Sequence, residues 1–463
     1  FRIHIKFIKE CDSHGQELIS SNGPLLLDTY MLAVSPPTAI SKIIGIWAAP
    51  GDTFFISDIA DAVGDYQGKG VRVEYSDDTL RFTNNTNLVT TEELVIDETF
   101  ALDAHVNGGV YFLNDVSSKE FNTGLIFSGE GTATAEADVD LAYFELQDGT
   151  WDQQSIDPTA QTFYANDFRL TGGEFKRFLN STTPFQIADV YGLQGLNTLS
   201  MTNDYTVVNN IDARVTESWN DGEGFMPIGS GGSAYQGIFN GGGHLIDGLT
   251  IHRPTENYVG LFSATTGATV EIQHIGLTNV DIIGNSNVGA LVGDVNNVNP
   301  VAGASISNVF VEGRVQGMSD NVGGVIGVLG TDATIDQAYS LGSVIGGWQR
   351  TGGLIGVINS GTNNVTNSFS MSTVTGGIFG IAGGFAGDIK AGAKLSRVYA
   401  QGDVIGSNGS TNVGGFAGTY SGAMLDQAYS TGLVSGTGLN FAGFIGQNIT
   451  GNITHSFWNT ETS

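Results

Sequence analysis

The chain has 463 residues, of which 40% are hydrophobic and 14% charged, so it holds enough apolar material to fold around a core. It has 18 basic and 47 acidic residues, which give a formal net charge of −29. This charge repels nucleic acid and anionic lipid, and we expect no nucleic-acid partner. No apolar run reaches the roughly 18 residues that a membrane-spanning helix needs, so we expect no membrane insertion.

Glycine and cysteine usage narrow the fold class. The chain has 67 glycines and 9 prolines, a balance that excludes collagen and indicates many turns and close backbone contacts. The single cysteine, Cys11, excludes an internal disulfide and a cysteine-based zinc site. The sequence opens FRIHIKFIKE, without Met and without a signal-peptide layout. We interpret it as a fragment or a processed form of a longer protein.

The first 200 residues are less regular than the rest. Residues 1–45 are expected to be an irregular lead-in. Over residues 46–182, short runs of strand formers such as VRVEY and VDLAYFEL alternate with Asn, Asp and Gly, which predicts irregular, acidic β-helix coils. Residues 183–200 predict an inserted helix and a junction. Thr183, Pro184 and Gln186 fit a capping box with proline at the first helical position.

Residues 201–463 contain a glycine-rich repeat of about 30 residues. NVGALVG at 287, NVGGVIG at 321, TGGLIG at 351 and NVGGFAG at 412 are copies of it. We expect the glycine to permit corner conformations closed to other residues and to let the coil turn tightly. The structural repeat glycines, spaced by 29 to 34 residues, are Gly260, Gly289, Gly323, Gly352, Gly383, Gly414 and Gly443.

A second motif recurs in the same phase, as in LSRVYAQGDVIG at 395 and LDQAYSTGLVSG at 425. Five residues after its aromatic comes a valine: Val315, Val344, Val374, Val404 and Val434. A unit of this size with short strands cannot bury its inner face alone, so successive units must stack. The pattern predicts an all-β fold, a parallel β-helix with one coil per repeat and the valines inside. A propeller blade needs about 40 to 50 residues.

The order of segments from about residue 168 carries a family resemblance. FRLTGGEF, PFQIADVYGLQGLNTL, YTVVNNIDA, WNDGEGFMPIG and YQGIFNGGGHLIDGLTIHRPTENYVGLF precede the glycine repeats, and SFWNTETS follows them. This succession resembles the GLUG-repeat region of filamentous-haemagglutinin-type surface adhesins, large bacterial exoproteins usually exported by two-partner secretion. The resemblance covers residues 168–463. It implies a right-handed β-helix that is secreted or held at the surface of a Gram-negative cell, although residues 1–167 match no export domain.

No residue pattern predicts a catalytic, metal or cofactor site. The seven histidines are scattered, without HExxH and without metal-ligand spacing. Paired carboxylates cleave glycosidic bonds, and some β-helix enzymes carry them on one face. The candidate pairs are Asp138 with Asp140, Asp77 with Asp78, and Glu92 with Glu93. Such dense acids also arise on a solvated acidic surface, so we predict no catalytic residue, no metal and no cofactor.

One aromatic per repeat forms a further column: Phe310, Tyr339, Phe369, Tyr399 and Tyr429. If the strand is straight there, the rings point outward and stack into a ladder on which sugar rings or an aromatic partner can lie. If the chain bends there, the rings close a corner of the core. The corner is favoured, because contiguous exposed aromatic patches are uncommon. For an exposed ladder, replacing its tyrosines with Ser should abolish binding and leave the melting temperature nearly unchanged.

Three functions fit these features. The preferred one is a non-catalytic extracellular adhesin or fibre segment that presents surfaces, the aromatic column among them, to host or matrix glycans or proteins. The second is a polysaccharide-active β-helix enzyme, a lyase or depolymerase. The third is a self-assembling filament component that contacts other copies of itself or the rest of a larger adhesin.

Overall fold

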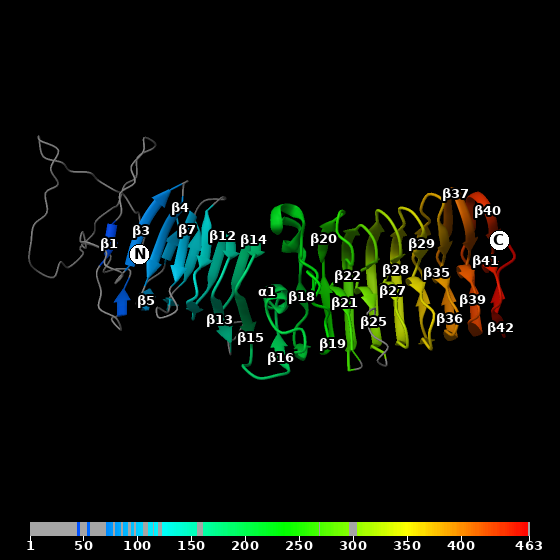
Figure 1. Ribbon diagram of the computed structural model, residues 1–463, viewed down its shortest axis with the longest axis horizontal. Coiled ribbons are helices and arrows are strands. Elements are labelled where there is room, and N and C mark those ends of the chain that lie inside the picture. The colour runs from blue at the N-terminus through cyan, green and yellow to red at the C-terminus, as the bar shows by residue number, and fades with distance from the viewer. Residues whose placement is uncertain are drawn as a thin grey trace, which may run out of the picture. The chain divides into compact units, whose positions relative to one another are not determined.

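The computed structural model describes residues 101–102, 110–113, 115–118, 123–154, 161–267, 269–295 and 303–461 with their side chains, and the backbone of the strands before residue 105. The chain forms two compact units, Phe1–Asn180 (unit 1) and Ser181–Ser463 (unit 2), both dominated by strands (Figure 1). Residues 1–43 of the expected lead-in, which include Cys11, lie outside the described residues, as do the acid pairs Asp77 with Asp78 and Glu92 with Glu93.

Unit 1 is built from two sheets. The first has the order β1, β3, β4, β7, β10, β12, β9, β6, with β14 also pairing with β12. Its strands are β1 (Ile44–Ile46), β3 (Val71–Ser76), β4 (Thr79–Asn84), β6 (Leu94–Ile96), β7 (Thr99–Ala104), β9 (Val116–Ser118), β10 (Gly124–Ser128), β12 (Val139–Leu146) and β14 (Phe163–Leu170). The second, in the order β15, β13, β11, β8, β5, β2, has β2 (Thr53–Phe55), β5 (Asn87–Thr90), β8 (Val110–Phe112), β11 (Thr132–Ala135), β13 (Thr150–Gln154) and β15 (Glu174–Phe178).

Most strands of unit 1 pair in parallel, as coils of a solenoid do. Strand β10 runs parallel to β7 and β12, and β11 runs parallel to β8 and β13. The described strands β1, β3 and β4 differ, because they pair with one another antiparallel, and β4 then pairs in parallel with β7. The interior between the two sheets is aromatic: Trp151 lies 5.0 Å from Phe144 and 5.8 Å from Phe112 between ring centroids. Wide side chains therefore separate the sheets of this unit.

Unit 2 holds the repeats. Its helices are α1 (Val190–Gly195) and the 3-10 turns η2 (Leu196–Thr198), η3 (Arg214–Ser218) and η4 (Asn220–Gly222). Its early strands are β16 (Phe185–Ile187), β17 (Tyr205–Val207), β18 (Ile211–Asp212), β19 (Ile238–Asp247), β20 (Thr250–Arg253), β21 (Phe262–Thr265), β22 (Glu271–Gly284), β23 (Val288–Gly289), β24 (Val292–Val295), β25 (Ser305–Gly317), β26 (Val322–Gly323), β27 (Ile326–Leu329), β28 (Thr334–Ile345), β29 (Arg350–Gly352) and β30 (Ile355–Ile358). Those that follow are β31 (Asn364–Thr366), β32 (Phe369–Ser370), β33 (Thr373–Thr375), β34 (Ile381–Gly383), β35 (Ala386–Ile389), β36 (Lys394–Ala400), β37 (Val404–Gly414), β38 (Ala417–Tyr420), β39 (Met424–Ser430), β40 (Val434–Ala442), β41 (Ile445–Asn448), β42 (Asn452–Thr454) and β43 (Phe457–Trp458).

The described strands of unit 2 pair in parallel, each with its equivalent in the next coil. One sheet runs through β21, β24, β27, β30, β35, β38 and β41, and the successive coils follow one another from green to red in Figure 1. The predicted valine column is continuous, since Val315 pairs with Val344, Val374 with Val404, and Val404 with Val434. The prediction of an all-β parallel solenoid with coils of about 30 residues is confirmed.

The predicted helix is present but begins later than expected. Residues Phe185–Ile187 form strand β16, which pairs in parallel with β17. Helix α1 starts at Val190, where the Asp189 carboxylate accepts a hydrogen bond from the Gly192 amide at 2.9 Å. The capping box assigned to Thr183, Pro184 and Gln186 is therefore wrong, because strand pairing determines the conformation of this segment.

The repeat glycines are required because a Cβ atom has no space at these positions. At Gly352 an added Cβ would collide with the Ile355 carbonyl oxygen and with the backbone of the next coil, and Gly383 and Gly414 have equivalent surroundings. Among the described residues, no repeat glycine has a positive φ. The expectation that these glycines adopt a backbone conformation closed to other residues is therefore wrong, and what requires glycine is the lack of space for a Cβ. Gly443 lies one residue past the column, since Gly414 pairs with Ala442.

Val404 tests which side chains face inward. It is fully buried beside Val374, Ala382 and Val413. We expect Val404→Asp to lower the free energy of unfolding by about 3 kcal/mol or more, because it buries an unpaired carboxylate. The matched control is Ile405→Asp, since Ile405 is 40% exposed. Chemical denaturation measures both, and a loss below about 0.5 kcal/mol for Val404→Asp, the range of surface substitutions, would contradict the facing assignment.

Buried tyrosines should make unit 2 sensitive to alkali. Tyr205 is 1% exposed, and burial raises the pKa of its hydroxyl to about 12; burial also raises the pKa of Tyr235 and Tyr420. An unfolded tyrosine ionises near pH 10. Above that pH the unfolded chain releases protons that the folded chain retains, so stability falls as pH rises from about 10 to 12.

The measurement is the melting temperature as a function of pH, followed by circular dichroism. Tyr205→Phe should reduce the fall above about pH 10 because it removes one of the ionising groups. A melting temperature that stays constant up to about pH 12 would show that these hydroxyls titrate as in the unfolded chain.

Candidate binding surface

The five repeat aromatics form one continuous stack, the aromatic ladder. Strand register pairs each ring with its equivalent in the next coil. Successive ring centroids are 5.0, 4.8, 4.6 and 4.7 Å apart, and the ring planes are within 2° to 4° of parallel. The rings, in order, are Phe310, Tyr339, Phe369, Tyr399 and Tyr429.

The ladder lies on the outer face of unit 2. The residues on either side of each ring are buried; Val398 and Ala400, for example, are 1% and 0% exposed, whereas Tyr399 between them is half-buried. Since side chains alternate between the two faces of a strand, the rings point away from the interior. The interpretation that they close a corner of the core is wrong.

The bend of the chain occurs two residues before each ring. The residues there have φ angles between 48° and 55°: Asn308, Gln337, Asn367, Arg397, Gln427 and His455. His274 has the same conformation in the coil where Gly276 takes the place of the ring. This left-handed conformation turns the backbone, after which the two-residue alternation resumes. The corner that the sequence placed at the aromatic therefore belongs to this polar column, and the following aromatic side chain emerges outward.

Stacking limits what the ladder can bind. Parallel rings less than about 5 Å apart cover one another's faces, so only their outer edges and the tyrosine hydroxyls meet solvent. Burial among its neighbours raises the pKa of the Tyr399 hydroxyl. A sugar ring cannot lie flat on an inner ring of the stack. Phe457 pairs with Tyr429 and is 68% exposed, so it extends the column by one further aromatic residue.

Hydrogen-bonded polar side chains border the ladder. The Asp336 carboxylate accepts hydrogen bonds of 2.6 Å from Thr366 and from Asn367, and Arg397 donates to the Asn367 side-chain oxygen at 2.6 Å. Three coils after Asp336, hydrogen bonds from His455 and Thr454 hold the pKa of the Asp426 carboxyl below its usual range. The surface is thus an apolar stripe with an ordered polar edge.

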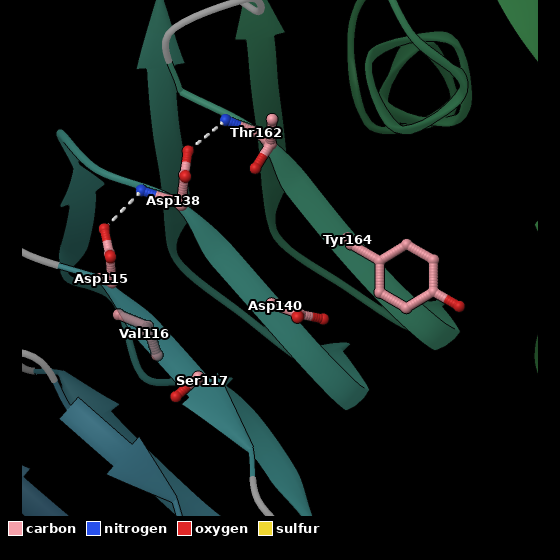
Figure 2. A pocket seen from close by; sticks show the side chains of 7 residues that line it. All are labelled: Asp115, Val116, Ser117, Asp138, Asp140, Thr162 and Tyr164. Atoms are coloured by element: carbon pink, nitrogen blue, oxygen red, sulfur yellow. Dashed lines mark hydrogen bonds between the residues drawn. The ribbon is translucent and has the colours of Figure 1, made fainter.

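The Asp138 and Asp140 pair lines a shallow depression in unit 1 with Asp115, Ser117 and Tyr164 (Figure 2). The Asp115 carboxylate accepts a hydrogen bond from the Asp138 amide at 3.3 Å, and the Asp138 carboxylate accepts one from the Thr162 amide at 2.7 Å. The carboxylates of Asp115 and Asp138 therefore each link two neighbouring coils. Over the described ranges of the chain, no three His, Cys, Asp or Glu side chains form a group able to hold a metal ion.

The structure also shows a cluster that the sequence reasoning missed. Trp348 and Phe379 are 49% and 60% exposed and lie in neighbouring coils, with ring centroids 6.1 Å apart. Both fall in the short segment between the buried valine and the glycine motif, where other coils carry Ser, Asn or Gly. Large apolar residues in a turn segment were the available signal.

Tyr399 tests how much the ladder stabilises the fold. Tyr399→Ser removes two stacked contacts, each worth about 0.5 to 1.5 kcal/mol, so the unfolding free energy should fall by about 1 to 3 kcal/mol. This revises the expectation that an outward ladder leaves stability unchanged. Tyr399→Phe is the control, because the column already accommodates Phe369. Equal stability of the two variants in thermal denaturation would rule out a stabilising stack.

No protein-family model matches the chain. Over 274 residues, 55% of this chain, it is 28% identical to halomucin of Haloquadratum walsbyi, of which the match covers 3%. Over 166 residues, 34% of this chain, it is 28% identical to an immunoglobulin A1 protease of Streptococcus pneumoniae, of which 8% is covered. The crystal structure of a candidate immunoglobulin A1 protease from Bacteroides ovatus has 18% identity and a TM-score of 0.47, over 60% of this chain and 84% of that one. In the described part of this chain, no helix is long and apolar enough to cross a membrane.

Proposed function

We propose that this chain is a non-catalytic extracellular adhesin or fibre segment that binds host or matrix glycans or proteins through the face of unit 2 that carries the aromatic ladder. The observation that carries the proposal is the ladder itself. It is an outward apolar stripe spanning five rings, from Phe310 to Tyr429, and polar side chains in fixed positions border it.

The regularity of the stripe suits repeated, weak contacts. Each coil adds one ring edge and one set of bordering polar groups at constant spacing, so an extended ligand meets several equivalent positions at once. Linked weak contacts strengthen overall binding beyond that of one contact. Because the ring faces are closed, a glycan would lie along the ring edges and hydrogen-bond to Tyr339, Tyr399 and Tyr429 through their hydroxyls.

The relatives support an extracellular location. An immunoglobulin A1 protease, by its name, acts on an antibody, and antibodies circulate outside cells; one such protein is 28% identical to part of this chain. The resemblance of residues 168–463 to filamentous-haemagglutinin-type adhesins adds the narrower proposal of a Gram-negative cell surface and two-partner secretion. Both likenesses concern a scaffold that many large exported proteins can carry.

A second candidate is a polysaccharide-active enzyme. The observation that favours it is the depression of unit 1, where Asp140 and Tyr164 face outward beside Asp138. Two carboxyl groups flanking a glycosidic bond can cleave it. The hydrogen bonds that tie Asp115 and Asp138 to neighbouring amides favour a structural role for two of the three acids.

One experiment separates the two functions. The purified chain is screened against arrays of glycans and matrix proteins, and the same samples are assayed for release of reducing sugar. We expect binding without release. Replacing Tyr339, Tyr399 and Tyr429 together with Phe keeps the stack and removes the hydroxyls, so it should weaken glycan binding at least about tenfold, or about 1.4 kcal/mol.

The matched control is Leu439→Ser, which changes an exposed residue outside the ladder and should leave binding unchanged. Unaltered glycan binding by the triple Phe variant would show that the tyrosine hydroxyls of the ladder do not contact the glycan. Release of reducing sugar that disappears in Asp140→Asn would favour the enzyme.

A further inference from the structure

A second exposed apolar surface, the corner patch, consists of Met318, Trp348, Ile378 and Phe379. These side chains are 51%, 49%, 51% and 60% exposed. Soluble proteins expose scattered apolar residues singly, whereas a contiguous group marks an interaction site. Trp, Phe and Met are also the residues enriched at protein interfaces.

The four side chains are contiguous because they occupy the same corner of successive coils. The Trp348 amide donates to the Ser319 carbonyl at 3.0 Å, and the Ile378 amide donates to the Gly347 carbonyl at 3.2 Å. These two bonds link the coils of Met318, Trp348 and Ile378 at this position. The Phe379 ring packs on Gly409 of the following coil, where an added Cβ would collide with it.

The patch differs from the aromatic ladder in ring geometry. The planes of Trp348 and Phe379 are inclined by 61°, so the rings meet edge to face and do not cover each other's faces as stacked rings do. A free ring face can pack against another ring or an aliphatic side chain. The corner patch thus offers the flat apolar contact that the ladder lacks.

The surroundings of the patch carry little charge beyond Asp320, whose carboxylate accepts a hydrogen bond from the Gln349 amide at 3.2 Å. Residues 337–387 contain a single charged side chain, Arg350, in a protein of net charge −29. Its guanidinium Nε lies 3.1 Å from the carboxylate of Asp388. Depletion of charge around exposed Trp and Phe is the composition of an interface core. For two copies of so acidic a chain, approach through a face with few carboxylates also costs less in electrostatic repulsion than approach through an acidic one.

We propose that the corner patch is a self-association surface at which a second copy of this chain binds side by side. A two-fold axis perpendicular to the solenoid, passing between the coils of Trp348 and Phe379, brings Trp348 of each copy onto Phe379 of the other. Such an isologous contact is the commonest form of homodimer. The proposal does not depend on what the aromatic ladder binds.

The size of the patch fits a reversible dimer. Each half-exposed ring offers on the order of 100 Å², and with the exposed parts of Met318 and Ile378 the patch approaches the roughly 300 Å² at the lower end of large functional patches. A stable interface buries about 800 Å² per partner. The remainder comes from polar neighbours such as Gln316, Gln349 and Asn408, which form the rim.

Sedimentation velocity of the full chain, from about 1 μM to about 1 mM, tests the proposal. We expect a monomer–dimer equilibrium in the wild-type chain. Trp348→Ser combined with Phe379→Ser should raise the dimer dissociation constant at least about tenfold, and Phe379→Glu should abolish the dimer, because it places two carboxylates near one another. The double Ser variant loses the edge-to-face contact of the two rings, so its melting temperature should fall by no more than a few degrees. Circular dichroism should show that both variants remain folded.

Met424→Ser, at a residue 55% exposed at the start of strand β39 and away from this corner, is the matched control and should dimerise as the wild-type chain does. A wild-type chain that stays monomeric throughout would overturn the proposal, as would a dimer that persists in the double Ser variant. A monomer whose glycan or matrix-protein binding depends on Trp348 would also overturn it and assign the patch to that ligand.

Discussion

Unit 2 depends on the close approach of backbones across a narrow interior. At the second glycine of the later motifs, as at Gly353, an added Cβ would collide with the backbone of the next coil and with the small side chain opposite. The residues that lie across from these glycines are Ser340, Ser370, Ala400 and Ser430. Ser340 and Ser430 also donate hydrogen bonds to glycine carbonyls at 2.7 and 2.5 Å. No large side chain fits there, so each neighbouring aromatic projects outward.

The same constraint explains which parts of the fold could be predicted from the sequence. The column that contains Val404 follows from spacing alone, because a buried position recurs once per coil and accepts only apolar side chains. The glycines were placed correctly as far as Gly414, but Gly443 was misplaced because the last motif has alanine at the column position. The helix start at Val190 depends on the pairing of β16 with β17, a contact between distant segments that no local capping signal reveals.

The surfaces were harder to predict than the interior. A straight strand would turn the ladder outward and a bend at the aromatic would turn it inward, and the decisive feature is that the left-handed bend lies two residues earlier, at residues such as Arg397. Such a conformation is uncommon for residues other than glycine, so composition gave no reason to expect it. Trp348 and Phe379 could have been noticed, because both interrupt a polar turn segment. Their mutual orientation is set by the stacking of the coils, which the spacing of residues along the chain does not reveal.

The unbroken pairing of equivalent residues bears on how such a protein changes in evolution. Because Val374 pairs with Val404 as Val404 pairs with Val434, duplicating or deleting one whole coil leaves every remaining junction chemically the same. Unequal recombination between repeats can therefore alter the reach of unit 2 without a folding penalty. Each added coil would also lengthen the outward stripe by one ring. The length of unit 2 and the number of rings that it presents therefore change together, and a single genetic event can alter both.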